Sequence, residues 1–266
     1  MKVGFIGAGN MASAMIGGIL NSKLLSPSNI IASAKTDKTL DSIKEKYEIN
    51  TTKDSVSLVK ECDIVVVAVK PYIYEEVLKQ IKDYVDNEKI IVTIAAGVTI
   101  KSVEEIIGND KKIIRTMPNT PALVNCGMSS LSPNKNICEQ DINAVKTIFD
   151  SFGKSQIVEE SLIDVVIGAS GSSPAYAFMF IEAMADCAVS YGMKREMAYE
   201  FCAQSLMGAA KMVLETKKHP GELKDMVCSP GGTTIEGVKT LENEGMRSAV
   251  IKGMTACIEK SIKMSK

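Results

Sequence analysis

Residues 2–12 read KVGFIGAGNMA, and this stretch decides the fold class. An apolar run typical of a strand passes directly into Gly7-x-Gly9-x-x-Ala12, and residues 10–22 continue with helical spacing. In this setting Gly7 permits a tight turn, Gly9 lets a pyrophosphate approach the backbone, and Ala12 keeps helix and strand close. The N–H groups at such a helix start attract phosphate. The stretch predicts a dinucleotide-binding unit; the alternative is the same turn in a flavodoxin-like fold without a nucleotide.

Strand and helix signals alternate along the rest of the first half. Strands are expected at 2–6, 29–33, 62–69, 89–96 and 111–117, and helices at 10–22, 39–47, 74–85 and 102–109. The valine-rich run at 62–69 is apolar throughout, as in a strand that is buried on both faces. Strands separated by single helices imply right-handed crossovers and a parallel sheet. We therefore expect an α/β fold whose residues 1–158 form a Rossmann-like, doubly wound parallel sheet.

The second half of the chain has a different character. Strand signals stop at Ser161, and helices rich in alanine and methionine are expected at 173–193, 195–216 and 249–264. They are apolar on more than one face, so they must be buried in a thick bundle or against another subunit. About 100 residues cannot enclose several such helices alone. An all-α dimerisation domain is therefore expected at 159–266; the alternative is a helical cap packed on its own sheet.

Composition narrows the class of protein. The 266 residues are 45% hydrophobic, enough for one large domain or two modest ones. The formal net charge is −1 without a polybasic stretch, which argues against nucleic acid or a membrane as a partner. Uninterrupted apolar stretches are too short to span a membrane, and the N-terminus has no signal-peptide layout. The seven cysteines include no Cys-x-x-Cys pair, and His219, the only histidine, precedes a turn signal. We expect a reduced, cytoplasmic protein without a metal site.

The end of the second strand bears on the choice of cofactor. An NAD site has an acidic residue about 20 residues beyond the glycines, whereas Ser33 and Lys35 stand here. A hydroxyl and an ammonium group suit a 2′-phosphate, and one hydrogen bond to a charged group is worth about 1.5–3 kcal/mol. That energy favours NADPH about ten- to a hundredfold. We expect NADPH, with NADH as the alternative if Lys35 is an ordinary solvated lysine.

The following strand ends have the features of a cofactor crevice. In open parallel sheets, ligands lie beyond the carboxyl ends of the strands. The third, fourth and fifth expected strands end in AVKP (68–71), AAG (95–97) and RTMPNTP (115–121). Small residues, prolines and single polar side chains let a flat ring approach the backbone, although such residues are also common in ordinary turns. We expect the cofactor to lie against these ends.

A second glycine-rich helix start is found at CSPGGTTIEGVKTLE, residues 228–242. Gly231 and Gly232 leave backbone N–H groups uncovered, and Thr233 and Thr234 add hydroxyl donors. Since the first glycine loop already accounts for the pyrophosphate, we expect a second anionic ligand here, a small carboxylate. The alternative is a capped helix that follows a glycine turn.

The stretch VCSPGGTTIEGVKTLE (227–242) resembles the signature of the pyrroline-5-carboxylate reductases. VGFIGAGNMA, AVKP, AAGVTI, RTMPNTP and ASGSSPAYAF match the same family in the same order, so the resemblance runs over essentially the whole chain. It implies reduction of 1-pyrroline-5-carboxylate to L-proline by NAD(P)H, the last step of proline biosynthesis. It also implies an interlocked dimer, and dimers that associate further into rings of five.

The resemblance also implies most of the candidate site residues. Together with Lys35, the expected cofactor-binding residues are Ile6, Gly7, Ala8, Gly9, Asn10, Met11, Ser33, Ser55, Ala68, Val69, Lys70, Pro71, Ala95, Ala96 and Asn119. Together with Gly231, the expected substrate-binding residues are Glu160, Ser229, Gly232, Thr233 and Thr234. Thr234 matches the threonine placed against the ring nitrogen and is the expected catalytic residue. The chain departs from the family at Ser173 and Ser55, where glycine and asparagine are usual, which bears on cofactor affinity.

Two other functions remain open at this point. A related reductase, such as a hydroxyacid dehydrogenase or a deazaflavin-dependent NADP reductase, would share the architecture. The hydroxyacid enzymes need a catalytic lysine or similar base, and ASGSSPAYAF has none. A non-catalytic NADPH sensor would not need the second glycine helix. We expect Lys70 to be a cofactor contact or solvated residue rather than a proton donor, and Cys228 to be a packing residue, because the reaction needs no covalent step.

Overall fold

The computed structural model describes residues 1–264. Contacts group them into two units, Met1–Ser172 with the residues from Cys257 onward, and Ser173–Ala256. The first unit extends past the boundary expected at residue 158. Glu160 bonds to Ile100 and Arg115, Ile163 is fully buried, and the Ser170 carbonyl accepts from Asn119. These contacts join the segment after the last strand to the sheet.

The first unit is built on one sheet with the strand order β3-β2-β1-β4-β5-β6-β7-β8. The strands are β1 (Val3–Ile6), β2 (Ile30–Ser33), β3 (Asn50–Thr52), β4 (Ile64–Val67), β5 (Ile90–Thr93), β6 (Lys112–Met117), β7 (Gly127–Pro133) and β8 (Gly153–Ile157). The first six run parallel, and β1 lies between β2 and β4. The order therefore reverses at β1, where doubly wound sheets bind their ligands.

The sheet was expected to be parallel throughout, but one pair of strands, β6 and β7, is antiparallel. All five expected strands are present, but β3, β7 and β8 were not anticipated, and β7 runs antiparallel to β6. Residues 118–126 join β6 to β7, and this connection is shorter than the dozen or more residues that a parallel crossover requires. The chain therefore returns in the opposite direction. The sheet then ends with β8, which pairs parallel to β7.

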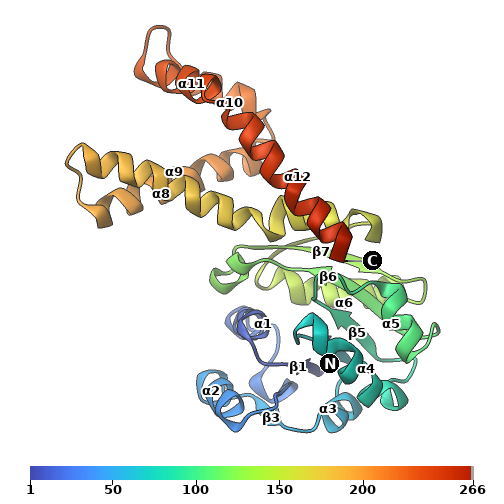
Figure 1. Ribbon diagram of the computed structural model, residues 1–266. Coiled ribbons are helices and arrows are strands. Elements are labelled where there is room, and N and C mark those ends of the chain that lie inside the picture. The colour runs from blue at the N-terminus through green and yellow to red at the C-terminus, as the bar shows by residue number, and fades with distance from the viewer. Residues whose placement is uncertain (265–266) are drawn as a thin grey trace. The chain divides into compact units, whose positions relative to one another are not determined.

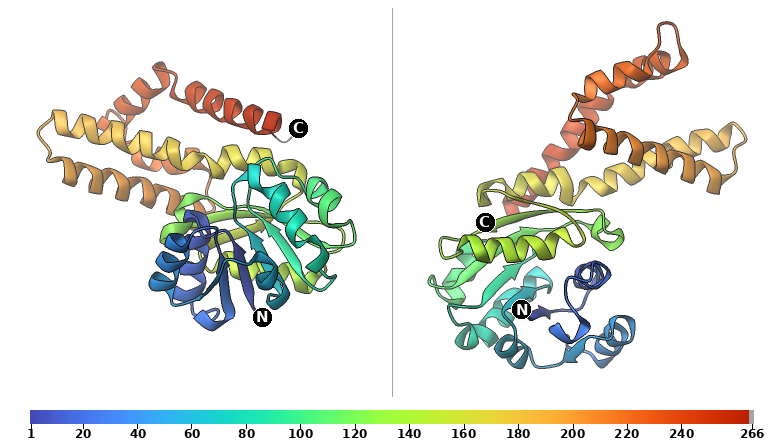
Figure 2. Two further views of the ribbon diagram at one scale, coloured as in Figure 1. Left: turned by 60° about the horizontal axis from the view of Figure 1, so that its bottom comes forward. Right: turned by 180° about the vertical axis from the view of Figure 1, so that it is seen from behind.

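Helices cover both faces of this sheet (Figure 2). They are α1 (Asn10–Asn21), α2 (Asp37–Tyr47), α3 (Ser55–Glu61), α4 (Tyr74–Ile81), α5 (Ile100–Ile107) and α6 (Glu139–Asp150). One core cluster joins the sheet to α1, α2 and α6 through residues such as Ile16, Ile43 and Phe149. The other joins its opposite face to α3, α4 and α5 through residues such as Leu58 and Val103. Helices α3 and α6 were not predicted.

Short helical turns complete the first unit. They are η1 (Pro27–Asn29), η2 (Pro71–Ile73), η3 (Lys82–Tyr84), η4 (Thr120–Val124), η5 (Glu160–Leu162), α7 (Ile163–Val166) and the π-helical turn η6 (Ile167–Gly171). The η2 and η4 turns directly follow strands β4 and β6, so they lie at the sheet edge where the cofactor is expected.

The second unit is entirely helical. It contains α8 (Ser173–Ser190), α9 (Arg195–Thr216), α10 (Pro220–Val227), α11 (Thr233–Asn243) and the first part of α12 (Met246–Met264). Helices α8 and α9 lie side by side (Figure 1). Within residues 173–256, all of which are described, the buried apolar residues are Ala185, Ala198 and Leu223. Phe178 and Phe201 are each 64% exposed. A single subunit therefore gives this unit almost no core, which favours burial against a second subunit.

Candidate active site

Gly7 forms the turn between β1 and α1 and is held there by backbone packing. Its φ is +101°, a conformation that suits glycine. A Cβ at this position would lie 2.6 Å from the carbonyl oxygen of Ala68. The Gly7 N–H donates to the Ser33 carbonyl oxygen at 2.8 Å. The glycine therefore keeps the ends of three neighbouring strands, β1, β2 and β4, close together.

Gly9 and the start of α1 present free backbone donors. Gly9 is the N-cap of α1, with φ −80° and no side-chain capping bond. The first backbone bond of the helix runs from Ser13 N to Gly9 O at 2.9 Å. The N–H groups of Asn10–Ala12 therefore precede the helical ladder. A Cβ on Gly9 would meet nothing within 4 Å, so the approach to these donors is open. Such a cradle fits a pyrophosphate.

A cavity of about 330 Å³ lies at the carboxyl ends of β1, β2 and β4. The predicted cofactor residues that line it are Ile6, Gly7, Ser33, Lys35, Ser55 and Val69. Lys53, Glu76 and Gln80 also line it, and they were not predicted. A second cavity, of about 310 Å³, is lined by Ala8, Gly9 and Asn10 together with residues of α1 and α2. The topology thus brings the predicted β1, β2 and β4 positions to one hollow.

The polar groups of the 330 Å³ cavity suit an added phosphate. The hydroxyls of Ser33 and Ser55 lie 3.2 Å apart, and the Ser33 residue is buried. Lys35 pairs with Glu76 at 3.1 Å, but both side chains are about 70% exposed, at 71% and 69%. An exposed ion pair contributes little stability, so Lys35 is free to exchange this partner for a phosphate. These residues therefore fit a 2′-phosphorylated nucleotide.

Asn119 has a structural role that the sequence did not indicate. Its Nδ2 donates to the Ser170 carbonyl oxygen at 3.0 Å, and its Oδ1 accepts from the Met128 N–H at 2.9 Å. The residue is 7% exposed. Both ends of its side chain therefore hold the η4 turn to β7 and η6. Its contact with the cofactor stays a prediction.

Glu160 joins strand β6 to the start of α5. Its Oε1 accepts from Arg115 Nη1 at 2.9 Å and from the Ile100 N–H at 2.8 Å. The Arg115 side chain is 4% exposed, and that of Glu160 is 33% exposed. Among the described residues, Arg115 Nε and Nη2 have no hydrogen-bond partner. The predicted contact of Glu160 with substrate is therefore untested, and the pairing with Arg115 was not anticipated.

The second glycine-rich stretch forms an uncapped helix start in the helical unit. Gly231 has φ +70°, and Gly232 is the N-cap of α11 without a side-chain capping bond. The Gly232 N–H donates to the Ser229 carbonyl oxygen at 3.0 Å. Thr233 and Thr234 are the first two residues of α11. Their N–H groups precede the helical ladder, as those of Asn10–Ala12 do in α1.

Comparisons with known proteins agree with these features. Residues 160–264 match the family model for pyrroline-5-carboxylate reductase dimerisation, and residues 2–97 match that for coenzyme F420-dependent NADP oxidoreductase. The pyrroline-5-carboxylate reductase of Escherichia coli (strain K12) is 50% identical over 265 residues, which cover 100% of this chain and 98% of that protein. The chain belongs to the pyrroline-5-carboxylate reductase family. The reductase of Methanosarcina acetivorans is 43% identical over the same shares of both chains.

Solved structures extend the comparison to the fold. The pyrroline carboxylate reductase of Plasmodium falciparum, solved with NADP bound, is 34% identical, with a TM-score of 0.89 over 100% of this chain and 98% of that chain. The pyrroline-5-carboxylate reductase of Coxiella burnetii is also 34% identical and covers the same shares, with a TM-score of 0.93. Prephenate dehydrogenase of Aquifex aeolicus, at 15% identity and a TM-score of 0.54, shares the fold alone. The expected Rossmann-like domain followed by a helical dimerisation domain is confirmed.

Histidine and cysteine have structural positions in this member of the pyrroline-5-carboxylate reductase family. His219 is the exposed N-cap of α10, and its Nδ1 accepts from the Gly221 N–H at 3.0 Å. The Pro-Gly pair after it therefore begins a helix rather than forming a simple turn.

The seven cysteines form no disulfide bonds. Burial raises the pKa of the Cys62 thiol to about 12, so this thiol stays protonated at neutral pH.

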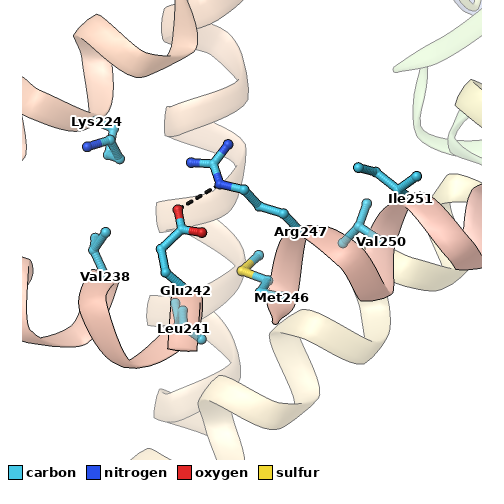
Figure 3. A pocket seen from close by; sticks show the side chains of 8 residues that line it. All are labelled: Lys224, Val238, Leu241, Glu242, Met246, Arg247, Val250 and Ile251. Carbon is cyan, nitrogen blue, oxygen red and sulfur yellow. Dashed lines mark hydrogen bonds and ion pairs between the residues drawn. The ribbon is translucent and has the colours of Figure 1, made fainter. Parts of the chain in front are cut away.

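A groove in the helical unit is mostly apolar. It has a volume of about 490 Å³, and Figure 3 shows the side chains of α10, α11 and α12 that line it. Val238, Leu241 and Val250 are among them, and Arg247 pairs with Glu242 at 2.6 Å. Thr233 and Thr234 are not among the lining residues. The groove lies within the residues that match the dimerisation model.

Proposed function

We propose that the chain reduces the C=N bond of 1-pyrroline-5-carboxylate to L-proline with NAD(P)H, the last step of proline biosynthesis. The observation that carries this proposal is the pair of uncapped, glycine-led helix starts in a chain of this family. One, at α1, suits the diphosphate of a nucleotide, and the other, at α11, suits the carboxylate of a small acid. A sensor that only bound NADPH would not need the second.

The cofactor is placed along the carboxyl ends of the parallel strands. We assign residues 6–11 to the pyrophosphate, and Ser33, Lys35 and Ser55 to the phosphorylated ribose. Residues 68–71 and 95–96 line the adenosine and nicotinamide sides, and Asn119 lies near the nicotinamide. NADPH is the preferred cofactor and NADH the alternative, because β2 ends without a carboxylate that would hold ribose hydroxyls. When bound, the cofactor supplies the hydride that reduces the imine carbon.

The start of α11 holds the substrate carboxylate. The free backbone N–H groups of Thr233 and Thr234, with the hydroxyls of Ser229 and Thr233, donate to its oxygens. Gly232, whose own N–H is bonded to the Ser229 carbonyl oxygen, leaves these donors uncovered because it has no side chain. Gly231 provides the left-handed turn that exposes these donors. Hydrogen bonds to an ionised group are about twice as strong as neutral ones. Anchoring this end fixes the face of the ring that is reduced, and such orientation is a large part of catalysis.

Thr234 is the residue that acts at the ring nitrogen. A cyclic imine protonated on nitrogen is already a strong acceptor of hydride, so the protein needs no nucleophile and no histidine. The Thr234 hydroxyl holds the nitrogen by a hydrogen bond and, once the imine carbon has been reduced, relays a proton from water to the resulting amine. The hydroxyl is half-buried at the first turn of α11, next to the donors that bind the carboxylate. Lys70 is exposed and is not given this role.

We also assign Glu160 to the substrate pocket, where only one of its two carboxylate oxygens is free to contact the substrate. Its Oε1 already accepts from Arg115 and Ile100. Contact with the ring nitrogen or its proton would be made by the other oxygen, Oε2. Both observed contacts of this carboxyl group are donated to it, so we assign Glu160 the role of a hydrogen-bond acceptor in the pocket.

The protein self-associates through its dimerisation domain, and we place this surface on α8–α12. The exposed apolar side chains of these helices, which include Met179, Val227 and Ile251 at 69%, 63% and 65%, supply it. Further association into rings of five dimers is also proposed. Sedimentation velocity measures the mass of the particle: a dimer alone would refute the ring, and a monomer would refute both.

The cytoplasm is the proposed location, with no nucleic acid or membrane among the partners. By length and composition alone, the helical segment Glu160–Ser190 could cross a membrane. Its most apolar stretch of 18 residues has a mean hydropathy of 1.2, and 17% of that stretch is buried. The same residues fall within the match to the dimerisation model. We assign its apolar character to contact with a second subunit.

A spectrophotometric assay tests the proposed function. Loss of absorbance at about 340 nm, where reduced nicotinamides absorb, is followed with NADPH or NADH, with and without 1-pyrroline-5-carboxylate. We expect oxidation that depends on the substrate and is faster with NADPH. Binding of NADPH without substrate-dependent oxidation would favour the sensor, and oxidation with a 2-oxo acid alone would favour a hydroxyacid dehydrogenase.

A further inference from the structure

The hydroxyl of Tyr74 lies between the carboxyl ends of β4 and β5. It accepts a hydrogen bond from the Ile94 N–H at 3.1 Å and donates one to the Val67 carbonyl oxygen. Tyr74 is the first residue of α4 and is 2% exposed. One side chain thus bridges the backbones of two strands that are neighbours in the sheet.

The register of β4 and β5 shows what this hydroxyl replaces. The two strands pair in parallel, and the Ile90 N–H donates to the Asp63 carbonyl oxygen at 3.0 Å. In a parallel ladder the bonds are evenly spaced, and every second residue of a strand donates to the same neighbour. Each step along this ladder advances by two residues on both strands. The first step leads from Ile90 and Asp63 to Val92 and Val65, and the second leads to the Ile94 N–H and the Val67 carbonyl oxygen. The Tyr74 hydroxyl stands in place of that last rung.

Two other ladders at this edge of the sheet, β1 with β4 and β1 with β2, close directly through backbone bonds. The Ala68 N–H donates to the Ile6 carbonyl oxygen at 2.7 Å, one residue beyond the end of β4. The Gly7 N–H donates to the Ser33 carbonyl oxygen at 2.8 Å, one residue beyond the end of β1. Backbone bonds therefore hold β1, β2 and β4 together to their ends, while a side chain separates β4 from β5.

We infer that Tyr74 is a positioning residue for the cofactor, because its hydroxyl sets the separation of the segments 68–71 and 94–97. This inference rests on the proposed function, which places these two segments along the adenosine and nicotinamide sides of the cofactor. A direct rung would hold the backbone N and O about 3 Å apart. Two hydrogen bonds in series hold them further apart, so the segments diverge where a flat ring has to fit.

The surroundings of Tyr74 keep this arrangement constant. Burial raises the pKa of the phenol above its usual range, against the opposing effect of the backbone bonds from Ile94 and Ala95. The hydroxyl is therefore protonated around neutral pH and donates to the Val67 carbonyl oxygen there. The ring packs in the core cluster that contains Val67 and Ile81, so it has little freedom to leave the gap.

Replacement of Tyr74 by phenylalanine tests the inference. The ring remains, the hydroxyl is lost, and the Ile94 N–H and Val67 carbonyl either close into a direct rung or lose their partner. Titration of the NADPH fluorescence should show a dissociation constant about tenfold higher than that of the unsubstituted protein, the effect of about one hydrogen bond. The KM for 1-pyrroline-5-carboxylate should change much less. A dissociation constant within about twofold of the original would overturn the inference.

Ile81→Val is the matched control. Ile81 lies on the same helix and in the same core cluster, is fully buried, and has no polar atom. Loss of its methyl group lowers stability by about 0.5–1.5 kcal/mol. NADPH affinity should be unchanged in this variant. An equal loss of affinity in both variants would mean that general destabilisation is responsible, and would reject the positioning role.

Two further measurements keep the inference testable if Tyr74→Phe does not fold. With 4-aminophenylalanine at position 74, a donor is retained at the same point, and NADPH affinity should return to that of the unsubstituted protein. In the unsubstituted protein, the Ile94 amide should exchange with solvent as slowly as that of Val92, and rapid exchange would contradict the bridge. Because these readouts need no turnover, they are independent of the assay with 1-pyrroline-5-carboxylate, whose failure would reject the proposed function instead.

Discussion

Arg115 and Glu160 connect the centre of the sheet to the segment that follows its last strand. Nη1 of the guanidinium lies 2.9 Å from Glu160 Oε1, and the Arg115 side chain is 4% exposed. The same carboxylate oxygen accepts the Ile100 N–H at the start of α5. One ion pair therefore holds β6, α5 and η5 together, directly beyond the loop that contains Ala95 and Ala96.

Removal of Glu160 should therefore destabilise the first unit. Glu160→Ala leaves the buried Arg115 charge without its partner, and breaking a buried pair in this way costs about 3–5 kcal/mol. Because Glu160 is itself 33% exposed, the low end of that range is expected. Urea denaturation measures the loss. Glu159→Ala is the control, since Glu159 is the exposed neighbour in the chain; equal midpoints for the two variants would show that the pair contributes nothing to stability.

The two glycines of the first loop should respond differently to substitution by alanine. A Cβ at Gly7 would lie 2.6 Å from the Ala68 carbonyl oxygen and would require a left-handed φ, so Gly7→Ala should lower stability by about 1–3 kcal/mol. A Cβ at Gly9 would meet no protein atom within 4 Å. Gly9→Ala should keep the melting temperature and weaken NADPH binding, because the methyl group enters the space meant for the pyrophosphate. Undiminished NADPH affinity in a folded Gly9→Ala protein would show that the pyrophosphate lies elsewhere.

Thr234→Ala should lower the rate of the chemical step without changing the affinity for the cofactor. Proton transfer from a positioned group typically contributes about 10²–10⁴-fold to the rate. We expect kcat to fall by about 10²-fold, with the NADPH dissociation constant unchanged, because Thr234 belongs to α11 and not to the first glycine loop. Thr240→Ala is a suitable control, since that hydroxyl donates to the Glu236 carbonyl oxygen further along the same helix. If Thr234→Ala keeps its kcat/KM, Thr234 has no part in the mechanism.

The pH dependence of stability should include a contribution from Asp141. Partial burial acts to raise the pKa of this carboxyl, but hydrogen bonds from the Cys138 N–H at 3.1 Å and from Lys112 at 3.2 Å outweigh it and hold the pKa below its usual value. Since the folded pKa is the lower one, the carboxylate stabilises the protein above the usual pKa of about 4 and loses this effect as the pH falls through the folded value. Asp141→Asn should therefore be less stable than the original protein at neutral pH, and the difference should shrink in acid. Urea midpoints over a pH series measure it, with the exposed Asp41→Asn as control; a difference that does not depend on pH would refute this account.

The sequence predicted the parts of the fold that show a clear local pattern, namely apolar runs and the first glycine motif. The runs that became β1, β2, β4, β5 and β6 are apolar and buried, and the glycine at position 7 has the positive φ that its motif requires. Strands β7 and β8 read GMSSLSP and GKSQI, and they lack hydrophobic alternation. Ser129, Ser130 and Ser132 of β7 are nonetheless buried. Because small polar residues fill this part of the sheet, periodicity of apolar residues could not reveal it.

Long-range contacts explain what the sequence could not predict of the site. Arg115 and Glu160 are 45 residues apart in the chain, and Asn119 is 51 residues from Ser170. No local pattern links such pairs. Tyr74 looked like the first residue of an amphipathic helix, and only the register of β4 and β5 shows its hydroxyl in the place of a backbone rung. The sequence motifs predicted which residues approach a ligand. The residues that hold those motifs in place were found only from the contacts in the structure.

A crystal structure of the enzyme with NADP and L-proline would test the central claim most directly, since that claim assigns two ligands to two separate helix starts. The account predicts the diphosphate on the N–H groups at the start of α1, and the proline carboxylate beside Gly232, on the N–H groups of Thr233 and Thr234. Proline bound anywhere else, with the start of α11 holding only solvent, would contradict it.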